Sequence, residues 1–236
     1  MNINEIAIIV PAYNEEKSLP NTLKEILTDY RKEQVIVVND GSADETSRLA
    51  RETGVIVLDL PDNMGIGVAM QTGYRYAANN GFQYALQCDG DGQHNPKDIP
   101  ILTKKMEETG AEMIIGSRFI DGSAEGFKSF FFRRVAIRYL SWWLRLLTGK
   151  RVRDITSGFR LVNRKGLEVF AEVYPFDYPE PESIVLLQNY GCTVLETPVT
   201  MRERQGGVSS IGLFAGVYYI VKVTIGLSIV KLRGNS

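Results

Sequence analysis

The sequence predicts an α/β fold with a mostly parallel central sheet, followed by a hydrophobic C-terminal helical segment. Short apolar runs alternate with segments of helical spacing through the first half of the chain. This alternation is typical of a parallel sheet that is covered by helices on both faces. Polar clusters follow three of the apolar runs, and after about residue 117 basic and aromatic residues replace the alternation.

Length and composition fit one large domain of this class. The chain has 236 residues, of which 44% are hydrophobic and 23% charged, and such a chain can bury a sizeable core. The net charge of −1 excludes a general nucleic-acid binder, because such proteins need a positive surplus. Cys88 and Cys192 fit neither a disulfide framework nor a zinc spacing, which favours the cytosol. The N-terminus has no signal-peptide layout.

The elements of the first half follow from the spacing of apolar residues. Strands are expected at 6–10, 35–38, 55–58, 84–88 and 113–115. Helices are expected at 19–27, from Asp44 onward, at 67–79 and at 98–109. The tetrapeptide Ser42-Ala43-Asp44-Glu45 matches a capping box and predicts where the second helix begins.

Polar residues gather where three of these strands are expected to end, at 11–15, 39–42 and 89–91. In open parallel sheets, ligands bind beyond the carboxyl ends of the strands. We therefore expect these three segments to form one site.

Asp89-Gly90-Asp91 is the most informative of the three segments. Two carboxylates separated by one glycine repel each other, so they require either a solvated turn or a cation that both can hold. Mg²⁺ or Mn²⁺ takes two carboxylates and fills its other positions with phosphate oxygens and water, and it helps a diphosphate to leave. Gln93, two residues after Asp91, makes the interpretation of this segment as a metal site more specific. For His94, the only histidine of the chain, a local hydrogen bond is favoured over a metal bond.

Other motifs mainly exclude functions. Gly65-x-Gly67-x-x-Met70 lacks the third glycine of a dinucleotide fingerprint, so its glycines are expected to permit close approach of a ligand or a helix. The chain contains no Gly-x-Ser-x-Gly motif, Walker A loop or Cys/His cluster. Nucleophilic hydrolase chemistry is therefore excluded.

The second half has two segments that suit a membrane surface. Residues 127–153 contain eight Lys or Arg, no Asp or Glu, and seven aromatic residues, which suits an anionic bilayer; a packed helix with a solvated basic side explains them equally well. Residues 211–230 have the length of a membrane span, but Lys222 near the middle is costly there. We favour a helix in the interface, or one packed on a partner's membrane helix, over one docked on the domain's own core.

The stretch RERQGGVSS is a further candidate. Arg202, Arg204 and Ser209 could form a flap over a diphosphate. A surface hairpin explains the same residues.

Several stretches together resemble the inverting family 2 glycosyltransferases of the GT-A fold, and most closely their dolichol- and polyprenyl-phosphate sugar synthase branch. These stretches are IIVPAYNEE, VVNDGSADET, NMGIGVAMQTGYRYA, CDGDGQHNP, IIGSRF, DITSGFRLVNRK and RQGGVSS. They occur in family order over residues 6–210. The resemblance implies a GT-A domain that binds a nucleotide sugar at 1–210, with a basic, membrane-facing part at 127–153, and a hydrophobic helix at 211–236.

The resemblance also implies a role for particular residues. The nucleotide would contact Pro11, Tyr13, Glu15, Asp40 and Asp89. Mg²⁺ or Mn²⁺ would be held by Asp89, Asp91 and Gln93. The acceptor phosphate would meet Arg118, Arg133 and Arg134, and Asp154, Ser157 and Arg160 would shape the sugar and acceptor side. The diphosphate flap would comprise Arg202, Arg204 and Ser209. The catalytic set would be Asp89, Asp91, Arg118, Asp154 and Arg204.

The implied reaction is metal-dependent, inverting transfer of a sugar from a UDP- or GDP-sugar to a polyprenyl phosphate. This acceptor is already anionic, so it needs positive charge more than a base. A saccharide or cell-wall glycan hydroxyl is the alternative acceptor, and it would need a base such as Glu182 or Glu180. The favoured interpretation of these two glutamates is a charge at a helix N-terminus, where the helix dipole stabilises it. Ser210 stands where the synthases usually have lysine.

The resemblance also bears on location and partners. Many polyprenyl relatives carry clear transmembrane helices, whereas this chain has only the segment 211–230. The expected location is peripheral, on the cytoplasmic face of the cell membrane. The expected further partner is a small membrane protein or a second copy of the chain, and no nucleic acid.

Overall fold

The computed structural model describes residues 1–120, 131–202 and 213–234, with side chains from 135 and from 218 onward in the last two ranges. Seven strands in this part form one sheet, in the order β3-β2-β1-β4-β6-β5-β7. Their bounds are β1 Ile6–Ala12, β2 Val35–Asn39, β3 Ile56–Asp59, β4 Tyr84–Gln87, β5 Met113–Ser117, β6 Arg160–Asn163 and β7 Val194–Pro198. Only β6 runs antiparallel to its neighbours within this sheet, which confirms the predicted mostly parallel α/β fold.

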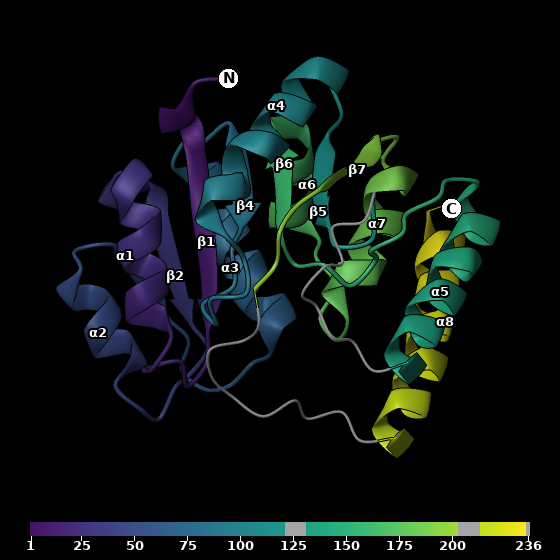
Figure 1. The fold of residues 1–236 in the computed structure, drawn as a ribbon, viewed down its shortest axis with the longest axis horizontal. Helices are drawn as coiled ribbons and strands as arrows, with labels where there is room; N and C mark the ends of the chain where they lie inside the picture. The colour runs from purple at the N-terminus through teal and green to yellow at the C-terminus, as the bar shows by residue number, and fades with distance from the viewer. Residues whose placement is uncertain (121–130, 203–212, 235–236) are drawn as a thin grey trace.

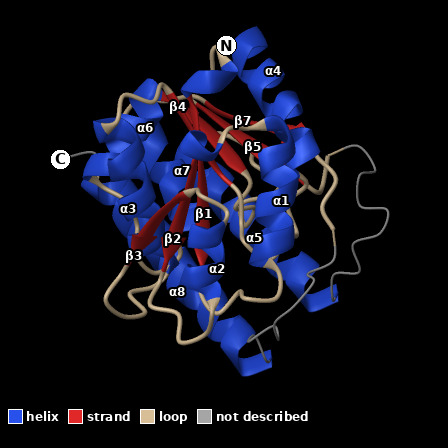
Figure 2. Cartoon of the chain, turned by 90° about the vertical axis from the view of Figure 1, so that its left-hand side faces the viewer, coloured by secondary structure: helices blue, strands red, loops and turns tan. Residues whose placement is uncertain are grey.

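Helices cover both faces of the sheet (Figures 1 and 2). One face packs against α1 Leu19–Asp29, α2 Thr46–Glu52 and α4 Ile99–Thr109. The other packs against α3 Ile66–Asn79, α5 Phe131–Thr148, α6 Arg164–Glu172, α7 Pro179–Asn189 and α8 Leu213–Arg233. Three short 3₁₀ helices, η1 Ile3–Glu5, η2 Lys32–Gln34 and η3 Pro96–Asp98, complete the described elements.

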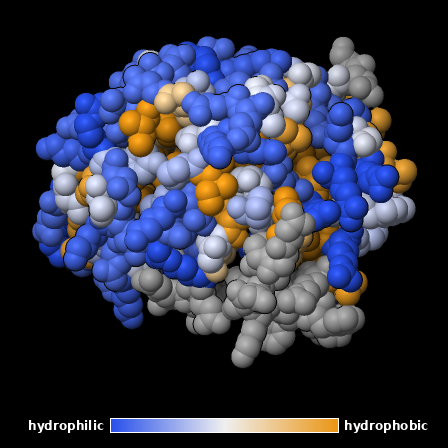
Figure 3. Space-filling view, turned by 45° about the horizontal axis from the view of Figure 1, so that its top comes forward, coloured by the Kyte–Doolittle hydropathy of each residue, from blue (hydrophilic) through white to orange (hydrophobic). Residues whose placement is uncertain are grey.

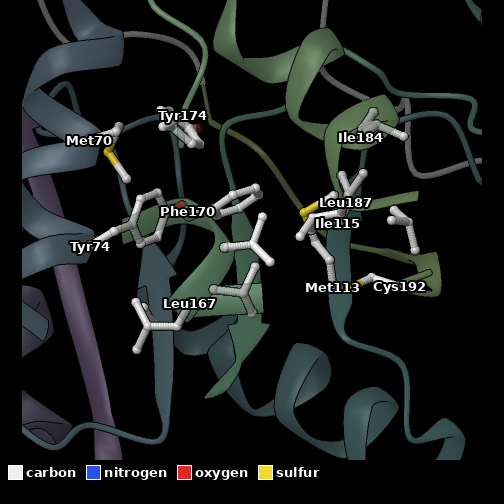
Figure 4. Close-up of a cluster of buried hydrophobic side chains, with 14 of the residues drawn as sticks. Met70, Tyr74, Met113, Ile115, Leu167, Phe170, Tyr174, Ile184, Leu187 and Cys192 are labelled. Atoms are coloured by element: carbon white, nitrogen blue, oxygen red, sulfur yellow. The ribbon is translucent and has the colours of Figure 1, made fainter. Parts of the chain in front are cut away.

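The alternation of side chains along β1 shows how the two layers form. Ile6, Ile8 and Val10 point into the layer of α1 and α4, whereas Ala7 and Ile9 point into the layer of α3, as expected for a strand buried on both faces. Figure 4 shows buried hydrophobic side chains of the layer that contains α3 and α6.

An aromatic cluster fixes α3 against α6 in that layer. The ring of Tyr74 lies 5.1 Å from that of Phe170 and 5.2 Å from that of Tyr174. These separations are typical of favourable aromatic pairs.

The capping-box prediction at the start of α2 is wrong. The N-cap is Glu45, and its side chain makes no cap hydrogen bond. Instead, Asp44 accepts hydrogen bonds from the backbone amides of Thr46 (3.0 Å) and Glu16 (3.2 Å). Burial alone would raise the pKa of the Asp44 carboxyl, but the hydrogen bond from the Thr46 hydroxyl and these two backbone bonds outweigh it and lower the pKa. The segment thus ties the helix to the turn after β1.

Helices α5 and α8 lie side by side at one edge of the molecule and extend toward the end at which β1 and β2 terminate (Figures 1 and 2). Leu140 and Leu144 of α5, and Val223 and Leu227 of α8, are fully buried. One face of α8 therefore docks on the domain's own core, which the sequence analysis ranked lower. Over the residues that the structure describes, no helix is both long and apolar enough to cross a membrane.

Candidate active site

A cavity of about 580 Å³ opens at the carboxyl ends of β1, β2 and β4. It is lined by Pro11, Ala12, Tyr13, Asn14, Glu15, Asp40, Asn63, Gly65, Ile66, Ala69, Gln87, Asp89, Gly90, Asp91 and Glu180. The three predicted polar segments therefore meet in one place. Ligands of ordinary size occupy cavities of about 300–1,000 Å³, so this one can hold a nucleotide sugar.

Asp40 organises the wall between β2 and α3. Its two carboxylate oxygens accept hydrogen bonds from the backbone amides of Met64 (2.8 Å) and Gly65 (2.9 Å). Gly65 has φ 91°, a backbone conformation that favours glycine. Asp40 is predicted to contact the nucleotide; the structure places it at the cavity and shows that it also fixes the loop leading into α3.

The turn after β1 is held by hydrogen bonds to the start of the α2 region. Asn14 accepts a bond from the amide of Ala43 (2.9 Å), and its own amide donates to Ser42 Oγ (2.9 Å). The amide of Glu15 donates to Thr46 Oγ1 (2.8 Å). This network sets the positions of Tyr13 and Glu15 in the cavity wall. Asn14 lies in the predicted segment 11–15 but was given no role of its own; its φ of 53° suits asparagine in a tight turn.

The acidic turn lies directly beyond β4. Asp89 is half-buried, and its Oδ1 accepts a hydrogen bond from Gln87 Nε2 (3.0 Å). Asp91 is buried and accepts one from the amide of Gln93 (3.0 Å). His94 Nδ1 accepts one from the amide of Asp89 (2.9 Å), and its ring stacks on Phe159. The prediction of a local hydrogen bond for His94 is confirmed.

This donor set fits a hard divalent cation. Among the residues that the structure describes, no group of three or more His, Cys, Asp or Glu side chains gathers into a metal site. A pair of carboxylates beside an open cavity suits Mg²⁺ or Mn²⁺, which take part of their oxygen shell from substrate phosphates and water. Gln93 follows the turn but is not part of the cavity wall.

Gly158, which the sequence analysis did not single out, packs against the same turn. A Cβ at this position would lie 2.7 Å from Gln87 Nε2 and 3.1 Å from Asp89 Oδ2. Glycine here lets the segment before β6 pack against the acidic turn without displacing the ends of the Gln87 and Asp89 side chains. The sequence feature that could have indicated Gly158 is its place in the motif DITSGFR.

Arg118 and Asp154 form a buried ion pair at the end of β5. Arg118 Nε and Nη2 each lie 2.7 Å from a carboxylate oxygen of Asp154, and the Arg118 amide also donates to it (3.0 Å). Asp154 is completely buried and Arg118 nearly so. The structure thus brings together two residues predicted to serve the acceptor side. Ser157 donates to the carbonyl of Gly116 (2.6 Å) and holds the same loop on β5.

Arg160 is a buried anchor for the first turn of α7. Its guanidinium donates to the carbonyls of Ser157 (2.6 Å), Glu180 (2.5 Å) and Ile155 (3.1 Å) and to Ser183 Oγ (2.7 Å). With four hydrogen bonds to protein groups, the Arg160 guanidinium holds the backbone that surrounds it, and its predicted role on the sugar and acceptor side stays a prediction.

The two glutamates of α7 have different surroundings. Glu180 lines the cavity, whereas Glu182 packs against α8, where a Cβ at Gly226 would meet its Oε1 at 2.5 Å. Burial raises the pKa of the Glu182 carboxyl and Asp177 adds to this, while Lys222 opposes it. The alternative role of Glu182 as a base is not supported by this geometry, because its side chain faces α8 and is not part of the cavity wall. Its place in the first turn of α7 agrees with the favoured interpretation as a helix N-terminal charge.

Arg202 is held in an ion pair away from the cavity. Its guanidinium donates to both carboxylate oxygens of Glu25 (2.9 and 2.7 Å) and to Asn95 Oδ1 (2.9 Å), and its amide donates to the carbonyl of Gln93 (2.9 Å). The guanidinium thus binds the protein itself, and the expected contact of Arg202 with a diphosphate stays a prediction. Arg204 and Ser209, and the side chains of Arg133 and Arg134, lie outside the described residues.

Comparisons with known proteins agree with this geometry. A family model described as Glycosyl transferase family 2 matches residues 7–170. A polyprenol monophosphomannose synthase of Mycolicibacterium smegmatis is 30% identical over 217 residues, which cover 86% of this chain and 80% of that protein. An undecaprenyl-phosphate mannosyltransferase of Micrococcus luteus is 28% identical over 221 residues, covering 87% of each chain.

A solved structure supports the fold. Glucosyl-3-phosphoglycerate synthase from Mycobacterium tuberculosis, in complex with Mn²⁺, UDP-glucose and phosphoglyceric acid, superposes with a TM-score of 0.69 at 18% sequence identity. The match covers 97% of this chain and 79% of that one. The described fold is accordingly GT-A-like, with a mostly parallel mixed sheet.

Proposed function

The chain belongs to glycosyl transferase family 2, and from this premise we propose that it transfers a sugar from a nucleotide diphosphate sugar to a polyprenyl phosphate. That it is a glycosyltransferase follows from the family. The observation that carries the finer proposal is the meeting of the acidic turn with the polar strand ends in one cavity. Two relatives named for polyprenyl phosphate acceptors support the lipid.

The donor would lie across the strand ends with its nucleotide toward β1 and β2. Pro11, Tyr13 and Glu15 line that end of the cavity together with Asp40. These groups would contact the base and ribose of a UDP- or GDP-sugar. The loops are already fixed by hydrogen bonds, which reduces the ordering cost of binding.

The diphosphate would lie at the acidic turn. Asp89 and Asp91, with Gln93, would hold Mg²⁺ or Mn²⁺, and the ion would offset the charge that develops on the departing nucleoside diphosphate. Hydrogen bonds from Gln87 and from the amide of Gln93 hold the two carboxylates in place. Arg204 and Ser209 remain predicted contacts of the diphosphate.

The acceptor phosphate would approach from the side of β5. It supplies an anionic oxygen, so the protein must offer positive charge and orientation. The proposed contacts are Arg118, whose orientation is fixed by Asp154, together with Arg133 and Arg134. Attack opposite the leaving diphosphate would invert the anomeric centre.

The surface of α5 and α8 supports work at a membrane. We define the α5–α8 face as Val135, Tyr139, Trp142 and Leu146 of α5 and Tyr218, Val221, Ile225, Ile229 and Leu232 of α8, all exposed. Residues 131–153 and 213–236 contain no Asp or Glu. In Figure 3, hydrophilic side chains cover most of the visible surface, and hydrophobic ones appear in several small groups, including some at the right-hand edge, where these helices lie.

An apolar face on helices that carry basic but no acidic residues suits a bilayer that contains anionic lipid. We propose peripheral attachment at the cytoplasmic face through the α5–α8 face. A small membrane protein or a second copy of the chain is the other proposed occupant of this region.

Product formation tests the proposal. The enzyme would be incubated with Mn²⁺ and UDP-glucose, UDP-N-acetylglucosamine or GDP-mannose, and with undecaprenyl phosphate in detergent, 3-phosphoglycerate or an octyl glucoside. Mass spectrometry should detect a glycosylated lipid phosphate with one donor. Transfer only to 3-phosphoglycerate or to the glucoside hydroxyl would contradict the proposed acceptor.

A further inference from the structure

Glu180 contributes a carboxylate to the cavity wall that the proposed reaction does not use. It lies in the first turn of α7 and lines the cavity together with Gln87 and Asp89. Its side chain accepts a hydrogen bond from its own backbone amide. Burial raises the pKa of the Glu180 carboxyl, and Asp89 adds to the rise, while Arg160 opposes it. Glu180 is therefore electrostatically close to the acidic turn.

The backbone of Glu180 is held firmly in place. The buried guanidinium of Arg160 donates to the Glu180 carbonyl (2.5 Å) and to Ser183 Oγ (2.7 Å). The segment that leads into α7 packs directly on α3, since a Cβ at Gly67 would lie 2.3 Å from the carbonyl oxygen of Pro175. A carboxylate fixed in this way is suited to orient a ligand group.

The strand order places Glu180 on the sugar side of the acidic turn. The neighbouring strands run β2, β1, β4, β6. The nucleotide walls come from β1 and β2, the acidic turn from β4, and Glu180 is anchored by Arg160 on β6. In a nucleotide sugar the diphosphate joins the nucleoside to the sugar, so a donor with its diphosphate at β4 extends its sugar toward β6.

We propose that the Glu180 carboxylate accepts hydrogen bonds from hydroxyl groups of the transferred sugar and so determines donor-sugar specificity. This inference rests on the proposed function, because it takes the ligand to be a nucleotide sugar. A carboxylate has two oxygens and can accept from two neighbouring hydroxyls. A polyprenyl phosphate needs no base, so the role of Glu180 is recognition.

Binding measurements on Glu180→Gln test this role. Isothermal titration would measure the Kd of UDP and of UDP-glucose with Mn²⁺, or of GDP and GDP-mannose if the enzyme uses guanosine. Glu182→Gln is the matched control, because it makes the same change two residues along, outside the cavity. We expect Glu180→Gln to leave nucleotide binding within about twofold and to weaken sugar-nucleotide binding about 10- to 100-fold, since an unpaired polar contact is costly.

Deoxy donors sharpen the test. A donor that lacks the contacted hydroxyl should bind wild type as weakly as the complete donor binds Glu180→Gln, and the substitution should then have no further effect. Equal weakening of UDP and UDP-glucose, or Kd values like those of Glu182→Gln, would overturn the inference. Unchanged donor binding with a lower kcat would overturn it too, because that is the behaviour of a base.

These measurements separate this inference from the proposed function. Donor binding needs no acceptor, so a sugar-specific effect of Glu180→Gln would stand even if polyprenyl phosphate were not glycosylated. Conversely, glycosylation of the lipid without such an effect would leave the proposed reaction intact and refute the role of Glu180.

Discussion

The nucleotide side of the sheet and the α5–α8 face differ in their surface side chains: polar ones that already bond within the protein in the first, exposed apolar ones in the second. At the ends of β1, β2 and β4, polar side chains are already bonded to protein backbone, as for Asp40 with the amides of Met64 and Gly65. On the α5–α8 face, apolar side chains such as Trp142 and Leu146 are 56% and 63% exposed. Among the described residues, the first region is already ordered by internal hydrogen bonds, whereas the second leaves apolar surface exposed.

This difference indicates which interactions each region uses for its function. Internal hydrogen bonds, each worth about 1 kcal/mol net, hold the donor loops in one geometry before any ligand binds. Exposed apolar area, at about 25 cal/mol per Å², gives its free energy only when a partner covers it. Substitutions in the first region should therefore change chemistry, and those in the second should change location.

The largest effect is expected at the acidic turn. Asp89→Asn removes one of two charges that would hold the cation, and turnover should fall about 10⁴-fold, or ~5.5 kcal/mol of barrier. The fold should persist, because Asp89 is half-exposed and an asparagine can still accept the hydrogen bond from Gln87. Initial rates with saturating Mn²⁺ and circular dichroism measure the two effects. Normal activity in this variant would refute the catalytic assignment.

A second prediction concerns the buried pair between the two regions. Asp154→Asn leaves the Arg118 charge without its partner carboxylate in the interior, which should lower the free energy of unfolding by about 3–5 kcal/mol. Asp177→Asn is the control, because its partner Lys222 is in an exposed pair. Urea unfolding should show a clear shift for the first variant and little for the second. Equal shifts of the urea unfolding curve would mean that the buried pair contributes no more to stability than the exposed pair.

The sequence predicted the donor region well because its signals are local. The positions of five strands and the meeting of 11–15, 39–42 and 89–91 follow from alternation and from the rule for strand ends. Gly158 and the Arg160 anchor of Glu180 were missed because they depend on packing between segments distant along the chain. The capping box at Ser42 failed for a related reason, since Asp44 is recruited by the turn after β1.

The helical region was harder to predict because α8 is apolar on both faces, and α5 exposes apolar side chains beside its arginines. A hydropathy pattern cannot tell which face meets the core, so docking on the domain and exposure to a partner looked like alternatives. In the structure α8 docks on the domain with one face and leaves the other exposed, with Val223 buried and Ile225 exposed two residues later. Likewise, no sequence pattern links Glu25 to Arg202, since their contact joins α1 to the segment after β7.

A third prediction tests the α5–α8 face as a lipid surface. Replacing Trp142 and Ile225 by serine should weaken binding to vesicles of phosphatidylglycerol and phosphatidylcholine about 100-fold, because each side chain would lose about 1–2 kcal/mol of burial. Ile101→Ser on α4 is the control, since Ile101 is 41% exposed on the other face. Sedimentation with vesicles measures the effect. Unchanged binding would favour a protein partner.

The smallest predicted effect tests whether the acidic turn depends on the segment after β7. Arg202 joins Glu25, Asn95 and the carbonyl of Gln93, so its loss should loosen the turn that carries the carboxylates. Because the Glu25 and Arg202 side chains are partly exposed, the ion pair should contribute about 1 kcal/mol. Arg202→Glu should therefore raise the Mn²⁺ concentration needed for half-maximal UDP binding about fivefold.

The charge-swapped double variant separates this role from direct contact with the diphosphate. Glu25→Arg combined with Arg202→Glu restores an ion pair of reversed polarity, and it should recover most of the Mn²⁺ dependence of wild type if the pair acts by positioning the turn. An arginine that bound the diphosphate directly could not be rescued in this way, because the swap leaves a carboxylate at position 202. Failure of the swap, with intact thermal stability, would move Arg202 back to the donor site and make the nucleotide side less complete than the described contacts indicate.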